Sequence, residues 1–190
     1  MLSPAYEEWA AYVADARALR NIGDTGCRRV GESCLPLSSA ETETLCRAAL
    51  VALSAAFERY VVGLFGLAAS ETGRSGLWAQ ERLLDPTGDD RRFANPSARN
   101  VRQLFGLLFH GQDVWAGIAT PMRSEDMVQE YVDEHQQYRH DVAHGRDSPR
   151  FSTADIRERI HEFERIVQAL DASVGGLVRH ATGKCTWSPP

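Results

Sequence analysis

Strand signals, paired cysteines and a basic overall charge are all missing from this sequence. No alternating run of β-branched residues lies between turn residues, which argues against a sheet protein. None of the four cysteines forms a CxxC pair, and a zinc knuckle or a disulfide framework would need cysteines closer together than these. We therefore predict reduced thiols at Cys27, Cys34, Cys46 and Cys185. The net charge of −5 argues against a protein that coats nucleic acid through a broad basic face.

A leader and a membrane-spanning run are also missing. The N-terminal sequence MLSPAYEEWAAY has no basic residues ahead of an apolar stretch, the order found in signal peptides. The longest apolar stretches are interrupted by Arg, Glu or Gly before they reach the length of a membrane span. Together with reduced cysteines, these absences predict a cytoplasmic protein that has no contact with a membrane.

Helix start and stop signals, by contrast, are frequent. Ser38 with Glu41 and Ser152 with Asp155 form capping boxes, in which each side chain satisfies an otherwise unpaired amide at a helix start. Gly145 suits the left-handed position that follows the end of a helix. The signals predict helices over residues 4–20, 38–69, 75–84, 96–108, 124–144 and 152–182, with Asn95 as the cap of the fourth.

These segments predict an all-α protein, an up-and-down helical bundle of five to six helices. With 190 residues, 43% of them hydrophobic, the chain can form one core without a disulfide or metal. We divide it into an N-terminal helix and cysteine-containing loop (1–36), the bundle itself (37–182) and a disordered tail (183–190). Apolar residues repeat at spacings of four and three from Ile156 to Leu177, which predicts a stripe packed against the bundle or another chain.

The segment Tyr138–Gly145 concentrates one permanent cation and two imidazoles at the predicted end of a helix. Cutting RNA without a metal requires groups that position the 2′-hydroxyl, exchange protons and hold the charge that develops on the phosphate. Imidazole titrates near neutral pH and suits the proton transfers. The planar guanidinium of arginine donates two parallel hydrogen bonds to a phosphate. Arg139 with His144 and His140 is therefore the candidate catalytic set.

The spacing of these residues predicts a dimer. Arg139 and His144 are five positions apart and differ by about 140° in direction on a helix, whereas His140 and His144 share one face. The set works if the helix frays at Gly145 and a second copy supplies its own Arg and His. We therefore expect a symmetric homodimer whose cleft lies on the two-fold axis.

Arg-His-x-x-x-His followed by Gly resembles the R-x4-6-H motif of HEPN domains, in which a polar residue often follows the Arg. The segments Phe57–Val61, Asn95–Val101 and Leu104–Phe105, together with Trp115, are similar to the RiboL-PSP-HEPN branch of that superfamily. The resemblance covers roughly residues 40 to 180.

The resemblance implies a dimeric helical bundle with endoribonuclease activity, of the kind found in toxin–antitoxin and anti-phage systems. By position, Arg139 and His144 are then the catalytic pair and His140 the supporting polar residue, where Asn is commoner. It implies RNA as the substrate, a possible cognate antitoxin and no cofactor. Arg146 lies on the loop after Gly145 and His135 one turn before Arg139, so we assign both to substrate binding.

Three other interpretations stay open. Arg139 can pair with an acidic neighbour on a solvated helix face, with His144 as a simple C-terminal cap. His140 and His144 also have the spacing of two metal ligands in a hydrolase, with a third to come from His110, His135, His161 or a carboxylate. The chain can finally be a HEPN module without catalysis that binds RNA, a nucleotide or a protein partner.

Overall fold

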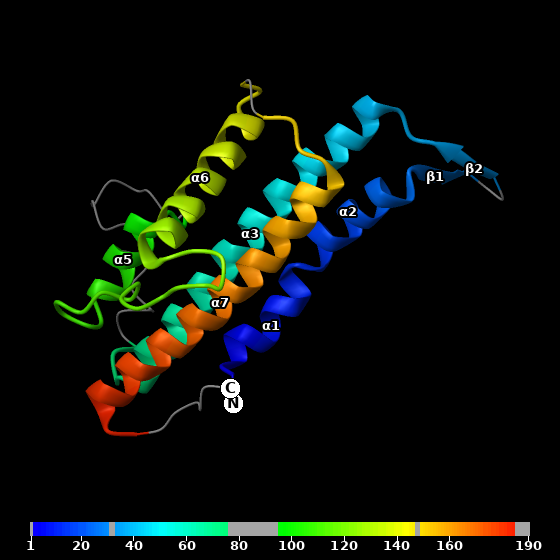
Figure 1. Cartoon of the computed structure of the whole chain (residues 1–190). Coiled ribbons are helices and arrows are strands. Elements are labelled where there is room, and N and C mark those ends of the chain that lie inside the picture. The colour runs from blue at the N-terminus through cyan, green and yellow to red at the C-terminus, as the bar shows by residue number, and fades with distance from the viewer. Residues whose placement is uncertain (1, 31–32, 76–94, 147–148, 185–190) are drawn as a thin grey trace.

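The computed structural model describes residues 2–30, 33–75, 95–146 and 149–184 and confirms a helical bundle. Figure 1 shows the long helices lying side by side and alternating in direction. The predicted helix at 75–84 and nearly all of the predicted tail fall outside the described residues. The elements are α1 (Pro4–Tyr12), α2 (Ala14–Thr25), β1 (Cys27–Val30), β2 (Ser33–Pro36), α3 (Ser39–Glu71), α5 (Ala98–Gly106), α6 (Glu125–Ala143) and α7 (Thr153–Thr182).

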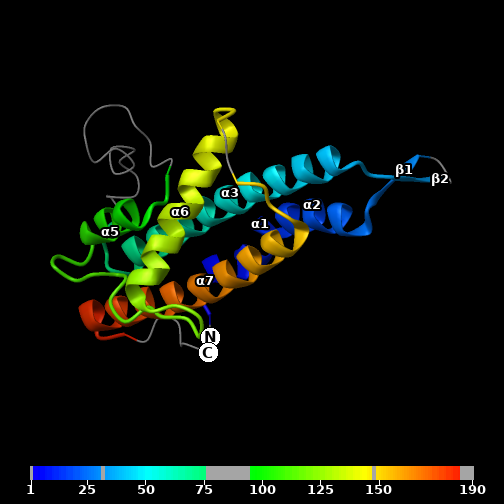
Figure 2. The same ribbon diagram turned by 45° about the horizontal axis from the view of Figure 1, so that its top comes forward.

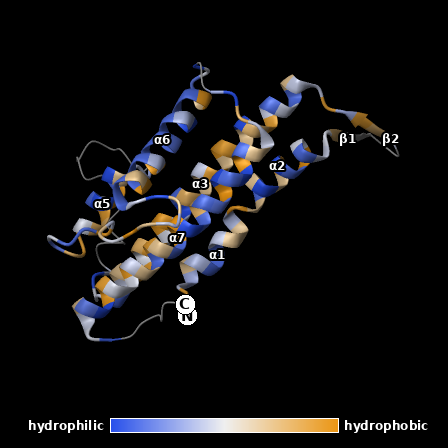
Figure 3. Cartoon of the chain, viewed as in Figure 1, coloured by the Kyte–Doolittle hydropathy of each residue, from blue (hydrophilic) through white to orange (hydrophobic). Residues whose placement is uncertain are grey.

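The two longest helices, α3 and α7, form the centre of the core. Both begin at the predicted capping boxes, because the serine and the acidic side chain three residues later bond each other's backbone amides. The rings of Phe57 and Phe163 meet edge to face with centroids 5.1 Å apart. The buried hydroxyl of Tyr60 donates to the carbonyl of Val167 at 3.0 Å. The predicted apolar stripe of α7 is thus a bundle contact, and hydrophobic residues gather on α3 and α7 in Figure 3.

The N-terminal segment belongs to this core. The prediction of a single helix over residues 4–20 is wrong. The helix is interrupted at Val13, which caps the end of α1 and the start of α2, and α2 continues to Thr25. Trp9, Val13 and Ala16 are almost fully buried, because the break lets both short helices follow α3. The side chain of Asp171 in α7 accepts hydrogen bonds from the Ser3 amide and hydroxyl. The two N-terminal helices therefore pack with α3 and α7.

A β-hairpin follows α2 where the sequence predicts only a loop. β1 and β2 pair antiparallel, and Figures 1 and 2 show them projecting beyond the helices. The hairpin brings Cys27 and Cys34 to a Cα–Cα distance of 5.7 Å, within reach of a disulfide, and the two are bonded. The prediction of reduced thiols is wrong for this pair, because the spacing along the chain did not reveal the turn. Cys46 is free and buried.

The composition of α3 alone would allow a membrane span. Its most apolar window is long and hydrophobic enough to cross a bilayer, but 56% of that window is buried inside the bundle. A helix that is apolar around most of its surface is expected where other helices cover it on several sides. α1, α2 and α7 all pack against α3, so its hydrophobicity is that of a core helix.

Two shorter elements position the candidate site. The cap of α5 is Ser97, whose hydroxyl accepts from the Asn100 amide, and not Asn95 as the sequence predicts. α6 starts after Ser124 and ends at His144, with Gly145 in the predicted left-handed conformation at a φ of 63°. α6 packs against α3 and α5, so its C-terminal end is held at one end of the bundle.

Candidate functional site

Arg139 continues the buried face of α6 toward the end of the helix. One turn earlier this face carries His135 and Gln136, both buried, and Arg139 itself is half-buried. Its charge acts on Glu58 of α3, where burial raises the pKa of the carboxyl group and the positive charge of Arg139 opposes that rise. Among the described residues, none forms a hydrogen bond or ion pair with the Arg139 guanidinium. The group thus lies on the side of α6 that faces α3, and within the described part of the chain its donors have no acceptor.

The acidic neighbours that could have paired with Arg139 are engaged elsewhere. Each carboxylate accepts a hydrogen bond from another donor. Asp133 accepts from an α5 backbone amide at 2.7 Å, Glu134 from a tyrosine hydroxyl at 2.8 Å and Asp141 from a glutamine side-chain amide at 2.9 Å. The interpretation of Arg139 as one half of a surface ion pair therefore finds no partner among these three residues.

The two histidines lie together at the same helix end. The rings of His140 and His144 have centroids 4.3 Å apart, as the i, i+4 spacing predicts. His140 is half-buried and His144, the residue that caps α6, is exposed. The backbone amide of His144 donates to the His140 carbonyl at 3.0 Å, so helical hydrogen bonding continues up to the residue before Gly145. Fraying is not needed to expose His144.

Arg146 lies directly after this end. Its amide donates to the Asp141 carbonyl at 2.9 Å, which closes the turn, and its guanidinium lies 3.9 Å from the Asp141 carboxylate. Such a long, exposed contact contributes little free energy and leaves the side chain able to turn to another anion. The structure therefore places Arg139, His140, His144 and Arg146 at the C-terminal end of α6, with Arg139 on the side that faces α3.

His135 does not line a cleft, so its assignment to substrate binding is wrong for this chain. The side chain is fully buried, with its ring 4.6 Å from that of Phe163. Neither ring nitrogen has a hydrogen-bond partner among the described residues. Burial lowers the pKa of His135 to about 3, and the charge of Arg159 adds to this effect. The ring is a neutral core group.

Acid should destabilise the fold through His135. Its pKa is lowered from 6.5 to about 3 in the folded chain, so between these pH values only the unfolded chain binds the proton. The stability that the folded chain gains from holding this ring neutral is complete above pH 6.5. As the pH falls below that value, the free energy of unfolding decreases by up to about 1.4 kcal/mol per pH unit. Urea unfolding at about pH 7, 6 and 5 should show a shallower dependence for His135→Leu than for the wild type.

The matched control is His180→Ala, which removes an exposed imidazole from the last turn of α7. This variant should keep the wild-type slope of unfolding free energy against pH. A His135→Leu variant with the same slope as the wild type would contradict the burial of a neutral ring.

No protein-family model, curated protein or solved structure matches this chain. Membership of the HEPN superfamily is therefore a proposal that depends on the motif formed by Arg139, His140 and His144 and on the segments that resemble the family. The metal-hydrolase interpretation needs a third ligand beside His140 and His144. Within the described ranges, no group of three or more His, Cys, Asp or Glu side chains is placed to hold a metal ion.

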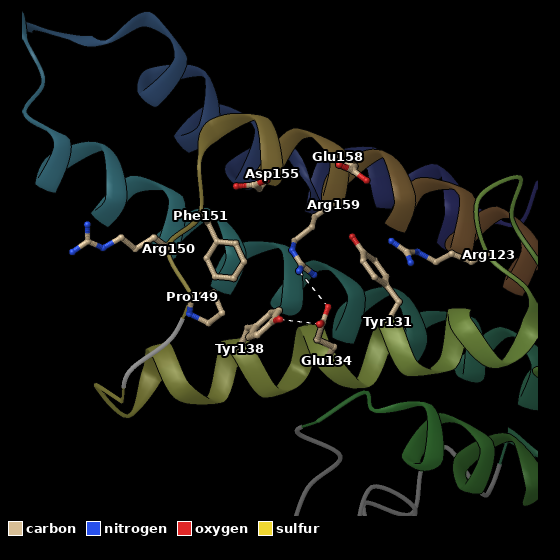
Figure 4. Close-up of a pocket in the computed structure, with 10 residues that line it drawn as sticks. All are labelled: Arg123, Tyr131, Glu134, Tyr138, Pro149, Arg150, Phe151, Asp155, Glu158 and Arg159. Carbon is tan, nitrogen blue, oxygen red and sulfur yellow. Dashed lines mark hydrogen bonds and ion pairs between the residues drawn. The ribbon is translucent and has the colours of Figure 1, made fainter.

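A separate cavity lies between α6 and α7, and sequence reasoning missed it. It has a volume of about 360 Å³, and Figure 4 shows Arg159 of α7 reaching toward α6 among aromatic rings. Its walls come from Arg123 ahead of α6, from α6 itself, from the connection at 149–151 and from the start of α7. No local spacing could reveal a pocket assembled from four segments. Trp115, which is part of the resemblance to HEPN domains, is fully buried and donates from Nε1 to the Ala98 carbonyl at 2.8 Å.

Proposed function

We propose that this protein is a metal-independent endoribonuclease of the HEPN type, acting as a homodimer with its cleft at the C-terminal end of α6. The observation that carries the proposal is the half-buried guanidinium of Arg139, which forms no hydrogen bond or ion pair among the described residues and lies at the same helix end as the adjacent imidazoles of His140 and His144. A phosphate is the ligand for which an unpaired guanidinium is best suited, and imidazole is the side chain best suited to move a proton near neutral pH.

In the proposed reaction His144 accepts the proton of the 2′-hydroxyl. The 2′-oxygen attacks the phosphorus, and the bond from phosphorus to the 5′-oxygen of the next nucleotide breaks. That oxygen leaves with a proton from an imidazolium, supplied by His140 or by the second copy of His144. Arg139 holds the non-bridging oxygens as charge builds on them, and Arg146 holds a flanking phosphate. The products are a 2′,3′-cyclic phosphate and a 5′-hydroxyl, so no water needs to be activated.

A second copy of the chain is part of the proposal because of the directions of the two side chains. Arg139 lies on the α3-facing side of α6, and His144 is about 140° further round the helix. Two copies that meet at this end can each place an Arg opposite the partner's His. An enzyme that cuts RNA in this way would act as a toxin or anti-phage effector, and a cognate antitoxin would hold it inactive.

The activity can be tested with purified wild-type protein. RNA incubated in EDTA should be cleaved at the same rate as with added Mg²⁺, and the 3′ ends should carry a 2′,3′-cyclic phosphate that acid opens. Light scattering should give the mass of a dimer. Loss of cleavage in EDTA, with recovery on addition of Zn²⁺ or Mn²⁺, would contradict the proposal and favour a metal hydrolase.

The alternative is a HEPN module that binds RNA, a nucleotide or a protein partner without cutting. The cavity between α6 and α7 favours it, because that pocket holds aromatic and charged groups but none of the proposed catalytic residues. Binding of RNA with no cleavage under any of these conditions would select this function.

A further inference from the structure

The cavity between α6 and α7 lies on a different side of α6 from Arg139. Tyr131, Glu134 and Tyr138 line it at spacings of three and four, so they share one face of the helix. Arg139 follows Tyr138 directly and points about 100° away from it. The cavity, whose lining residues are drawn in Figure 4, is therefore adjacent to the proposed cleavage site along the chain but contains none of its residues.

Arg159 is the central group of this cavity. Its side chain is only 13% exposed, and its guanidinium carbon lies 5.0–5.3 Å from the ring centres of Tyr131, Tyr138 and Phe151. Nη2 donates to Glu134 over a long 3.4 Å, and Nη1 is buried without a hydrogen-bond partner among the described residues. A guanidinium has five N–H donors, and a buried donor without an acceptor costs free energy. This group is suited to receive an anion from the cavity.

Two of the three acidic residues that line the cavity already accept hydrogen bonds from other donors. Glu134 is shared with the hydroxyl of Tyr138, which donates to it at 2.8 Å. Asp155 accepts from the Ser152 amide and hydroxyl in the capping box, and these bonds lower the pKa of its carboxyl group. Both carboxylates thus have their own donors, which reduces their repulsion of an incoming anion.

A second arginine at the mouth is free to move. The side chain of Arg150 is 88% exposed, and its Nε lies 3.8 Å from a carboxylate oxygen of Glu43. An exposed pair at this distance contributes little to stability, so Arg150 can exchange Glu43 for a ligand. Arg123, at the other side, instead covers the ring of Tyr131 at 4.0 Å. Anion binding would therefore involve Arg159 inside the cavity and Arg150 at its rim.

We infer that this cavity binds one nucleotide unit of single-stranded RNA beside the cleavage site, an inference that rests on the proposed function. The phosphate pairs with Arg150 and Arg159, and the base packs against Tyr138, Phe151 and the plane of a guanidinium. Aromatic rings and guanidinium planes beside phosphate-binding groups are the means by which proteins hold unpaired bases. A volume of about 360 Å³ falls in the range of small-ligand pockets.

The charges of the cavity favour a single strand over a duplex. Three arginines are balanced by three carboxylates, from Glu134, Asp155 and Glu158, so there is no surplus of positive charge to follow a long phosphate backbone. Recognition must then come from one base and one or two phosphates at a time. Only an unstacked base can enter between the rings.

The experiment uses a short fluorescent oligonucleotide in which every 2′-oxygen is methylated. It has no 2′-proton to lose, so binding is measured apart from cleavage. Arg150→Ala and Phe151→Leu should each weaken its binding to the full-length protein about 10-fold in fluorescence anisotropy, the size expected for losing a phosphate contact or a stacked base. Arg179→Ala, which removes an exposed arginine from the far end of α7, should bind as the wild type does.

Arg150→Ala removes an almost fully exposed side chain, so this variant tests the inference even if Phe151→Leu is unstable. Affinity that stays unchanged in both variants would overturn the inference. So would competition by free AMP or inorganic phosphate at lower concentration than by unlabelled oligonucleotide, because the ligand would then be a small anion. Cavity-dependent binding without any cleavage by the wild type would uphold the inference and refute only the proposed nuclease.

Discussion

Replacing His144 with alanine lowers the rate constant of RNA cleavage about 10²–10⁴-fold if its imidazole is the general base of the reaction. Arg139→Ala should cost about 10²–10³-fold, because the donors that stabilise the charged transition state are lost. Both variants should keep the fold, since His144 is exposed and Arg139 is half-buried without a hydrogen-bond partner among the described residues. Single-turnover cleavage of a labelled RNA in EDTA measures both rates, and circular dichroism confirms the helical content.

The chain offers matched controls at the end of α7. Arg179 and His180 are likewise an arginine and a histidine in the last turn of a helix, both exposed, and Figure 1 places that turn at the opposite end of the bundle. Their replacement by alanine should leave cleavage unchanged. Equal cleavage by the wild type, Arg139→Ala and His144→Ala would show that the activity is a contaminant or that these residues are not its source.

A mixture of the two inactive variants tests whether the site is shared between copies. A heterodimer of Arg139→Ala with His144→Ala has one intact arginine and one intact histidine at the two-fold axis. Partial recovery of cleavage after mixing is expected if the partner's residues complete the cleft. No recovery, with heterodimers demonstrated by mass, would place the active site within a single chain.

The largest effect on stability is expected for Phe163→Ala. This fully buried ring contacts Phe57 of α3 and both Tyr131 and His135 of α6, with centroids 4.6–6.0 Å apart. Removing it leaves a cavity where three helices meet, and the free energy of unfolding should fall by about 3–5 kcal/mol. Urea unfolding followed by circular dichroism measures the change.

Met122→Ala is the control, because it also shortens a large apolar side chain but at a site that is 66% exposed. Its free energy of unfolding should stay within about 0.5 kcal/mol of the wild type. A loss below about 1 kcal/mol for Phe163→Ala would mean that α6 does not pack on α7 and α3 as described.

Features that depend on near neighbours in the sequence were predicted well. The capping boxes at Ser38 and Ser152, the left-handed Gly145 and the facing pair of His140 and His144 all depend on residues three to five positions apart. Helical geometry alone determines whether such residues meet. The fold class and most helix ends could therefore be derived without knowing which helices pack together.

Features that depend on distant partners were missed or misplaced. His135 has the same spacing to Arg139 whether it is exposed or buried, and only its contact with Phe163 of α7 decides that it is a core residue. The disulfide of Cys27 and Cys34 depends on a turn that strand pairing creates. Arg159 gave no signal in the sequence, because the aromatic rings around it come from two other segments.

By itself, the sequence determined that this chain is a helical bundle and that one helix ends in an arginine and two imidazoles, because hydrogen bonds within a few residues specify both. Only the tertiary structure decided that Arg139 faces α3, that His135 is buried and that a cavity surrounds Arg159. Burial is a property of how helices pack. It depends on contacts between side chains that lie far apart along the chain, and no local pattern encodes those contacts.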